Sequence, residues 1–316
     1  MMWQRETFKK IKQIPREEHV LPGTSLCAGC GGLEALRLAS KVLGDHVVYV
    51  NAAGCFTLLA VYPFTPFNAS WLYTTMGSAS AGAQGIRDAL DVLIAKGRLP
   101  KEEDLKVVVL GGDGSTYDIG LSSTSAAIYR KLDFYYICYD NEAYGNTGVQ
   151  LSSATPYGAR TTTSPCSVQH PAGAAQEKKD IFEIWRAHRP PYVATVSPRY
   201  PLDLEEKFAR AARFTGPKLF LAFSACPTGW LFDPAQTPEV ARLAVETGLW
   251  PLKEAINGEI THTYIPKRKP VEAYLKVQGR FRHLFEPVVQ TDAVKHIQER
   301  VDEYWRSQQA REGPKI

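Results

Sequence analysis

The chain alternates short apolar runs with helix-like stretches through its middle, and this alternation constrains its fold more than any other feature. The apolar runs that predict strands are Val47–Asn51, Lys106–Leu110, Phe134–Tyr139, Tyr192–Val196 and Lys218–Phe223. The stretches that predict helices between them are Ser78–Lys96, Leu121–Lys131 and Leu202–Thr215. This order is typical of βαβ units around a parallel sheet. We therefore expect an α/β fold with a parallel sheet and helices on both faces.

The pattern changes beyond Trp250. Glu259–Ile265 has the pattern of an edge strand, and Lys267–Pro270 is a basic loop that contains proline. Thr291–Arg311 predicts an amphipathic helix with one apolar face. We expect two parts: an α/β domain in residues 1–250, and a C-terminal extension in residues 251–316 that packs on this core or on a partner subunit.

Composition and charge exclude several other classes of protein. A chain of 316 residues with 44% hydrophobic content can bury a full core. Its net charge is only +4 and no basic run is interleaved with aromatic residues, so we expect no nucleic-acid partner. Met1–Arg16 is polar, and the apolar region Val47–Phe64 is interrupted by Asn51, Gly54 and Pro63. We therefore expect neither a signal peptide nor a membrane span, and a cytoplasmic location.

Glycines and polar side chains follow two neighbouring predicted strands. Gly111–Gly114, with the sequence GGDG, follows Lys106–Leu110 directly, and Asp140–Gly148 begins where the next strand ends. Because the carboxyl ends of parallel strands meet at one edge of a sheet, these loops are expected to lie side by side. Glycines allow backbone N–H groups to approach a phosphate, and carboxylate and amide oxygens suit Mg²⁺. A GDG segment on its own is equally compatible with a tight turn.

The two loops together resemble the thiamine-diphosphate motif, in which an asparagine follows GDG after a fixed interval. The similarity extends through Asp118–Gly120, Tyr139–Tyr144, Asn146–Gly148 and Ser152–Pro156. These segments resemble the β subunits of archaeal-type pyruvate:ferredoxin oxidoreductases, in the pyruvate/oxalate branch of the 2-oxoacid:ferredoxin oxidoreductases. This resemblance implies a thiamine-diphosphate-binding fold. The roles that it implies are magnesium binding by Asp113, the Asn141 side chain and the Ala143 carbonyl, a catalytic position facing the reacting centre for Asn146, and diphosphate contacts from Gly112, Gly114, Thr147 and Gly148. Glu142 replaces a second asparagine of the general motif, as this branch tolerates.

Four of the six cysteines form a second group. Cys27 and Cys30 make a C-x-x-C pair, Cys55 follows a glycine, and Cys226 precedes a proline. Their spacing leaves open a structural zinc site, an iron–sulfur cluster and unrelated buried thiols. The resemblance implies that these four cysteines bind one [4Fe–4S] cluster, with Cys55 also beside the thiamine cofactor, whose electron-rich intermediates need an acceptor. Cys138 is expected to be a buried residue of a strand.

The same resemblance implies partner chains. An α subunit would supply the activating glutamate and the substrate-binding residues, γ and δ subunits would carry ferredoxin-like clusters, and ferredoxin would accept the electrons. The expected assembly is a dimer of heterotrimers or heterotetramers, and we expect the chain alone to be inactive.

The substrate expected from the resemblance is a small 2-oxoacid. Pyruvate-type β subunits usually carry a Phe-Glu-Asn-like segment where this chain has Tyr73–Ser78. A missing carboxylate would suit a more anionic substrate, because a negative side chain repels a dianion. Pyruvate and oxalate therefore both remain open. Two other hypotheses are a zinc-stabilised, non-catalytic binding module and a thiamine-dependent decarboxylase without electron transfer, the latter leaving the four cysteines without a role.

Overall fold

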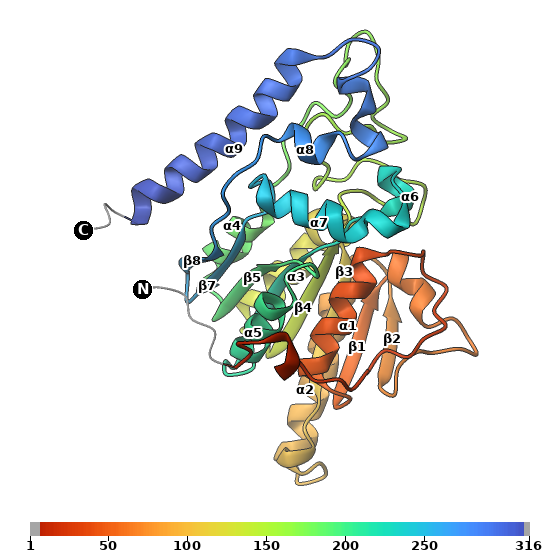
Figure 1. The fold of residues 1–316 in the computed structure, drawn as a ribbon. Helices are drawn as coiled ribbons and strands as arrows, with labels where there is room; N and C mark the ends of the chain where they lie inside the picture. The colour runs from red at the N-terminus through yellow and green to blue at the C-terminus, as the bar shows by residue number, and fades with distance from the viewer. Residues whose placement is uncertain (1–6, 313–316) are drawn as a thin grey trace.

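The computed structural model describes residues 7–312, and its centre is one eight-stranded sheet (Figure 1). The strands are β1 (Val47–Ala52), β2 (Ser70–Thr74), β3 (Lys106–Gly112), β4 (Phe134–Asp140), β5 (Tyr192–Val196), β6 (Pro217–Phe223), β7 (Leu252–Ile256) and β8 (Glu259–Tyr264). Their order is β2-β1-β3-β4-β6-β5-β7-β8. The first six strands pair in parallel, whereas β7 and β8 are antiparallel additions at one edge.

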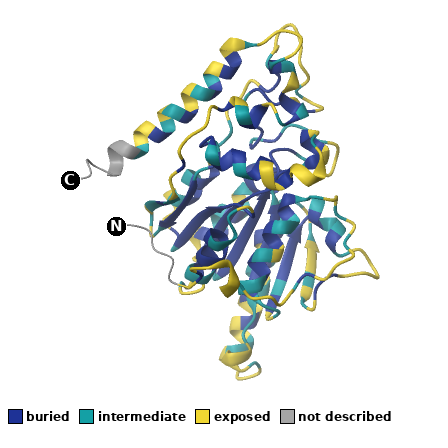
Figure 2. Ribbon diagram, viewed as in Figure 1, coloured by how far each residue is buried: buried dark blue, intermediate teal, exposed yellow. Residues whose placement is uncertain are grey.

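Alternate residues of the central strands enter two separate cores, one on each face of the sheet. Val108 and Leu110 of β3 pack on one side, and Val107 and Val109 pack on the other. One face is covered by α1 (Gly31–Leu43) and α5 (Pro201–Ala211). The other face is covered by α2 (Ala79–Ala95), α3 (Leu121–Tyr129), α4 (Ile181–Ala187) and α7 (Thr237–Glu246). Figure 2 shows the central strands buried between these layers, as continuous apolar strands of a parallel sheet require.

The predicted α/β fold with helices on both faces is confirmed, and its core strands lie within one or two residues of the predicted bounds. The predicted parallel pairing holds for β1 to β6, and the sheet continues with two antiparallel strands, β7 and β8. The sequence interpretation missed β2 and β7. The apolar run in Ser70–Thr74 is only three residues long and none of it is buried, and in β7 the buried residues Lys253 and Glu254 interrupt the apolar pattern. The structure confirms that Glu259–Tyr264 is an edge strand.

The C-terminal residues pack on the same core. The amphipathic helix α9 (Thr291–Glu312) buries Val294, Ile297, Val301 and Trp305, and the Trp305 indole donates a hydrogen bond to the Gly248 carbonyl at 3.1 Å. Three short helical segments complete this region: α6 (Pro227–Trp230), α8 (Glu272–Leu275) and Gly279–Leu284. No helix among residues 7–312 is long and apolar enough to cross a membrane. The expectation for the polar N-terminal stretch falls partly on residues 1–6, outside the described residues.

Glu205 on α5 gives the fold a testable pH dependence. Its carboxylate is buried, and neither oxygen has a hydrogen-bond partner among the described residues. Burial raises the pKa of Glu205 to about 8, from 4.5 for an exposed group. Between pH 4.5 and about pH 8 the folded chain therefore keeps a proton that the unfolded chain releases. The contribution of Glu205 to the free energy of unfolding is fully present below pH 4.5 and is lost as the pH rises to about 8.

We expect Glu205→Gln to raise the melting temperature by at least about 2 °C at pH 8.5 and to have little effect at pH 5. Thermal unfolding of the purified chain at both pH values checks this expectation. Glu102→Gln, at an exposed position, serves as the control. An equal change at both pH values would show that the Glu205 charge does not limit stability.

Candidate active site

A cavity of about 160 Å³ opens at the carboxyl ends of β3 and β4. The two strands are parallel neighbours, with Gly112 paired to Tyr139, so the loops that follow them lie side by side as predicted. The predicted site residues that line the cavity are Cys55, Gly112, Asp113, Gly114, Asn141, Ala143, Asn146 and Thr147. Gly148 is not part of the lining; it lies in the exposed end of the same loop with a φ of 112°.

Asp113 is held by the loop geometry with its carboxylate buried. The Ser152 hydroxyl donates to Asp113 Oδ2 at 2.5 Å. A helical turn, Gly114–Ile119, begins directly after it, so backbone N–H groups at its start lack helical acceptors. Gly114 is required here because a Cβ atom would lie 2.3 Å from the Tyr144 ring. Burial and the nearby Asp140 charge raise the pKa of Asp113 well above its usual value, so its ionised form needs a cation.

The Asn141 amide lies among the predicted magnesium ligands. One terminal atom of this amide is 2.7 Å from the Ala143 carbonyl and 2.8 Å from Asp113 Oδ1. With no metal bound, the amide nitrogen occupies this position and donates to both oxygens. With the amide turned over, its oxygen would join these two oxygens, and oxygens are the ligands that Mg²⁺ prefers. The donor set therefore fits magnesium.

The other end of the same amide reaches the cysteine group. The terminal atom of the amide that faces away from Asp113 lies 3.7 Å from Cys55 Sγ. Cys55 also lines the cavity, at the start of the helical turn Cys55–Leu59. A single side chain therefore spans from the predicted magnesium ligands to one of the predicted cluster cysteines.

Three of the four predicted cluster cysteines lie at the start of helical segments. Cys30 is the N-cap of α1, Cys226 is the N-cap of α6, and Cys55 is the first residue of its turn. The Gly229 backbone N–H donates to Cys226 Sγ at 3.3 Å. Burial, together with the neighbouring cysteines, raises the pKa of Cys30 to about 11 and of Cys55 to about 12. These thiols therefore need a bound cation to ionise at neutral pH.

The C-x-x-C loop packs directly on the Cys226 segment. The Gly31 N–H donates to the Ala225 carbonyl at 3.1 Å, and a Cβ atom at Gly31 would lie 2.7 Å from the Ala225 nitrogen. Thr237 also donates to the Gly29 carbonyl at 2.7 Å. Segments far apart in the sequence are thereby held together. Among the described residues, however, no three cysteine, histidine or acidic side chains approach closely enough to form a metal site by themselves.

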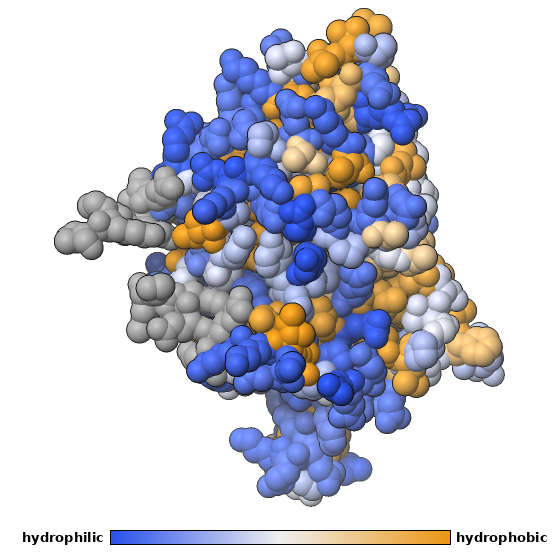
Figure 3. Space-filling view, in the orientation of Figure 1, coloured by the Kyte–Doolittle hydropathy of each residue, from blue (hydrophilic) through white to orange (hydrophobic). Residues whose placement is uncertain are grey.

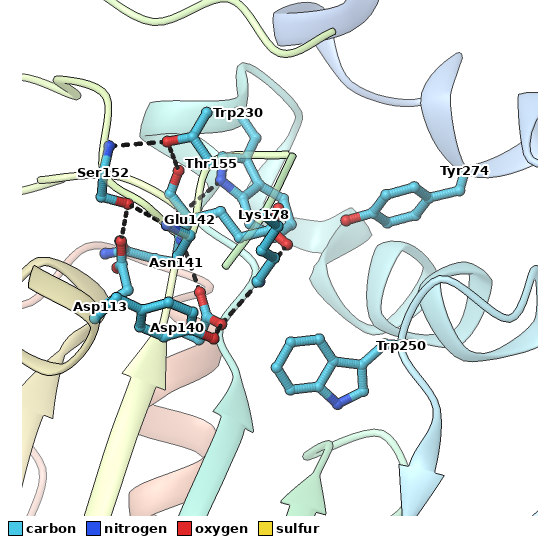
Figure 4. A network of polar contacts seen from close by, with 12 residues as sticks. Asp113, Asp140, Asn141, Glu142, Ser152, Thr155, Lys178, Trp230, Trp250 and Tyr274 are labelled. Atoms are coloured by element: carbon cyan, nitrogen blue, oxygen red, sulfur yellow. Dashed lines mark hydrogen bonds and ion pairs between the residues drawn. The ribbon is translucent and has the colours of Figure 1, made fainter. Parts of the chain in front are cut away.

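Sequence reasoning missed a buried network of charges behind the site (Figure 4). Lys178 pairs with Asp140 at 2.8 Å and with Glu142 at 2.9 Å, and Arg280 pairs with Glu142 at 2.7 Å. Burial alone would raise the pKa of Glu142, but the charges of Lys178 and Arg280 outweigh it and lower the pKa. The two carboxylates flank Asn141 directly. In the sequence, the local sign of this network is the pair of acidic residues, Asp140 and Glu142, on either side of Asn141.

A larger cavity of about 290 Å³ lies on the far side of this network. Lys178, Trp250 and Tyr274 contribute to its lining, together with residues of α9. Gly248 is the one glycine that lines it, and it lacks the GDG loop of the smaller cavity. The cavity at the ends of β3 and β4 therefore fits a metal-bound phosphate better.

Comparison with known proteins agrees with this geometry. Residues 52–221 match the family model described as thiamine pyrophosphate enzyme, C-terminal TPP-binding domain. Over 292 residues the chain is 47% identical to the pyruvate synthase subunit PorB of Methanothermobacter thermautotrophicus, covering 92% of this chain and 97% of that one. The chain belongs to the 2-oxoacid:ferredoxin oxidoreductase family. As a β subunit of this family, it takes part in thiamine-dependent oxidative decarboxylation by a multisubunit enzyme.

Two further relatives of this oxidoreductase subunit extend the comparison. The ketoisovalerate oxidoreductase subunit VorB of Pyrococcus furiosus is 40% identical over 290 residues, covering 90% of this chain and 92% of that one. A solved structure of the 2-oxoglutarate:ferredoxin oxidoreductase from Magnetococcus marinus covers 76% of this chain and 84% of its own, with a TM-score of 0.53 and 22% identity. This last similarity shows a shared fold.

Proposed function

We propose that this subunit binds thiamine diphosphate through a magnesium ion and passes electrons from a small 2-oxoacid to a [4Fe–4S] cluster. Bound thiamine diphosphate supplies the nucleophile that attacks the oxoacid carbonyl. Asp113, the Asn141 side chain and the Ala143 carbonyl hold the magnesium ion. Gly112, Gly114 and Thr147 line the cavity and approach the diphosphate with their backbones, Gly148 does so from the end of the same loop, and Asn146 faces the reacting centre.

One observation carries this proposal more than any other. One end of the Asn141 amide faces Asp113 and Ala143, and the other end faces Cys55. The magnesium site and the electron acceptor would then be separated by a single side chain. A structural zinc site would gain nothing from this position beside a thiamine cavity, and a simple decarboxylase would need no acceptor there.

The cluster ligands we propose are Cys27, Cys30, Cys55 and Cys226. Each iron of a cubane takes one thiolate, and three of these cysteines begin helical segments whose N–H groups favour negative charge. The Gly229 N–H bond to Cys226 is of the kind that tunes cluster potentials. A reducing compartment keeps such thiols available, so we place the enzyme in the cytoplasm.

For the substrate, we propose pyruvate or a closely related 2-oxo monocarboxylate. Relatives matched over most of their length are named for pyruvate and ketoisovalerate. Tyr73 and Met76, from the segment that lacks the expected carboxylate, line the cavity and leave its wall uncharged there. Because this wall has no negative charge that would repel a dianion, oxalate is the competing substrate in the experiment described below.

We propose that an α subunit completes the site, supplying the activating glutamate and the substrate-binding residues, and that chains with ferredoxin-like clusters carry electrons to ferredoxin. Exposed apolar residues lie on β2 and on the loop before it, namely Val61, Tyr62, Phe64, Leu72 and Tyr73. Figure 3 shows apolar side chains gathered on this flank. Tyr73 also lines the cavity. In this proposal residues 1–250 form the cofactor domain, residues 251–316 form an extension of it, and the assembly is a dimer of heterotrimers or heterotetramers.

The test uses the complex purified without oxygen together with its co-purifying subunits. Ferredoxin reduction is followed with pyruvate, 2-oxoisovalerate and oxalate as alternative substrates, with and without added thiamine diphosphate. We expect thiamine-dependent reduction with pyruvate, and none from the isolated chain. Fastest reduction with oxalate would replace the substrate assignment, and no reduction with any oxoacid would refute the function.

A further inference from the structure

We propose that Arg280 is a positioning residue that fixes the magnesium-binding turn and the Cys226 helix relative to each other. The inference rests on the proposed function, in which the turn binds magnesium and Cys226 binds the iron–sulfur cluster. It adds a role for a residue of the C-terminal region, far in sequence from both motifs.

The Arg280 side chain is buried, at 3% exposure, and its orientation is fixed by several acceptors. Its Nη2 donates to Glu142 Oε2 at 2.7 Å and to the Tyr274 hydroxyl at 3.2 Å. Its Nε donates to Gln278 Oε1 at 2.9 Å. A guanidinium held from two directions cannot turn without breaking a buried hydrogen bond, which is costly.

Glu142 connects Arg280 to the magnesium site. It lies between Asn141 and Ala143, the two residues of this loop that provide metal ligands, and its φ of 61° is in the left-handed region. A non-glycine residue holds this conformation only when its surroundings impose it. The Thr155 hydroxyl donates to the Glu142 carbonyl at 2.7 Å, while Arg280 and Lys178 hold its carboxylate. The side-chain contacts of Glu142 therefore help to set the separation of the two ligands.

Trp230 connects Arg280 to the cysteine group. The guanidinium carbon lies 3.7 Å from the centre of the Trp230 ring. The Trp230 indole donates to the Asn141 carbonyl at 2.9 Å, and Trp230 ends the short helix α6 that begins after Cys226. Arg280 therefore contacts both Glu142, in the magnesium-binding turn, and Trp230, at the end of the helix that follows Cys226. Figure 4 shows the Trp230 indole directed at Asn141, with Glu142 beside them.

Lysine cannot replace arginine at this position in full. An ammonium group can keep the ion pair with Glu142, but it lacks the planar face that stacks on Trp230 and the second donor toward Gln278. The two effects of Arg280 are therefore separable: charge for the magnesium turn, and stacking for the Cys226 helix.

The experiment compares the wild-type complex, Arg280→Met, Arg280→Lys and Glu142→Gln, with Arg282→Met as the matched control because Arg282 is exposed on the same short helix. The dissociation constant of thiamine diphosphate is measured at fixed Mg²⁺, and the reduced cluster is examined by electron paramagnetic resonance. We expect Arg280→Met to raise the dissociation constant at least about 10-fold and to change the cluster spectrum. Arg280→Lys should change the spectrum while keeping the dissociation constant within about 3-fold of wild type.

Glu142→Gln tests the same contact if Arg280→Met does not fold, because glutamine keeps the shape of the side chain. This variant should also raise the dissociation constant of thiamine diphosphate. Wild-type values of either the dissociation constant or the spectrum in Arg280→Met would overturn the proposal. So would the same changes in Arg282→Met. Failure of the wild-type complex itself to bind thiamine diphosphate would refute the proposed function, which separates that outcome from failure of the Arg280 role alone.

Discussion

Asp113→Asn is expected to abolish useful binding of thiamine diphosphate without weakening the fold. The substitution removes the one carboxylate among the three proposed magnesium ligands, so we expect the dissociation constant of thiamine diphosphate with Mg²⁺ to rise about 100-fold. In the metal-free chain the same change relieves repulsion from Asp140 and burial of a charge. The melting temperature of the metal-free protein should therefore stay the same or rise.

Calorimetric titration and thermal unfolding of the same preparations check both halves of this prediction. Asp292→Asn, at an exposed position at the start of α9, is the control and should change neither quantity. An Asp113→Asn variant that binds the cofactor normally would show that Asp113 does not bind the metal. Lost binding with a lower melting temperature would instead indicate a structural role.

Cys226→Ser is expected to remove the iron–sulfur cluster and to reduce ferredoxin reduction by at least about 100-fold. Serine keeps a side-chain oxygen that can accept the Gly229 N–H bond, so α6 should still begin normally. The loss would then report the missing thiolate and not a displaced helix. Iron and labile sulfide are measured per complex, together with the visible absorption of the cluster.

Cys166→Ser is the matched control, because Cys166 is exposed in a polar loop away from the other cysteines. It should keep full iron content and activity. Unchanged iron in Cys226→Ser would exclude this residue as a ligand. Zinc in place of iron in the wild-type complex would restore the hypothesis of a structural metal site.

The sequence predicted those parts of the fold that depend on local patterns. The central strands could be identified because burial on both faces requires uninterrupted apolar runs, as in Phe134–Asp140. Of the two edge strands, Glu259–Tyr264 was predicted, whereas Ser70–Thr74 was missed because none of its residues is buried and its apolar run is short. The helix α1 was missed because it opens with Gly31 and Gly32, which disfavour helix but allow the close approach to Ala225.

In the candidate site too, the residues marked by a local sequence pattern could be predicted, whereas those that act through tertiary contacts could not. Asp113 and Asn141 could be found because each directly follows a strand, and strand order then places them together. Ser152 and Arg280 could not be assigned in this way. Each acts through a contact with a residue distant in sequence, and a buried ion pair such as Arg280–Glu142 leaves no periodic signal. The C-terminal region therefore contributes more to the site than its sequence indicates.

A magnesium ion held by Asp113 and Asn141 should lie one side chain away from a cluster held by the four cysteines. Anomalous diffraction from crystals of the complete complex, grown with thiamine diphosphate and with Mn²⁺ in place of Mg²⁺, locates both metals in one experiment. We predict a manganese peak among Asp113, Asn141 and the Ala143 carbonyl, and an iron peak among Cys27, Cys30, Cys55 and Cys226. A manganese peak elsewhere, or no iron at the cysteines, would refute this arrangement.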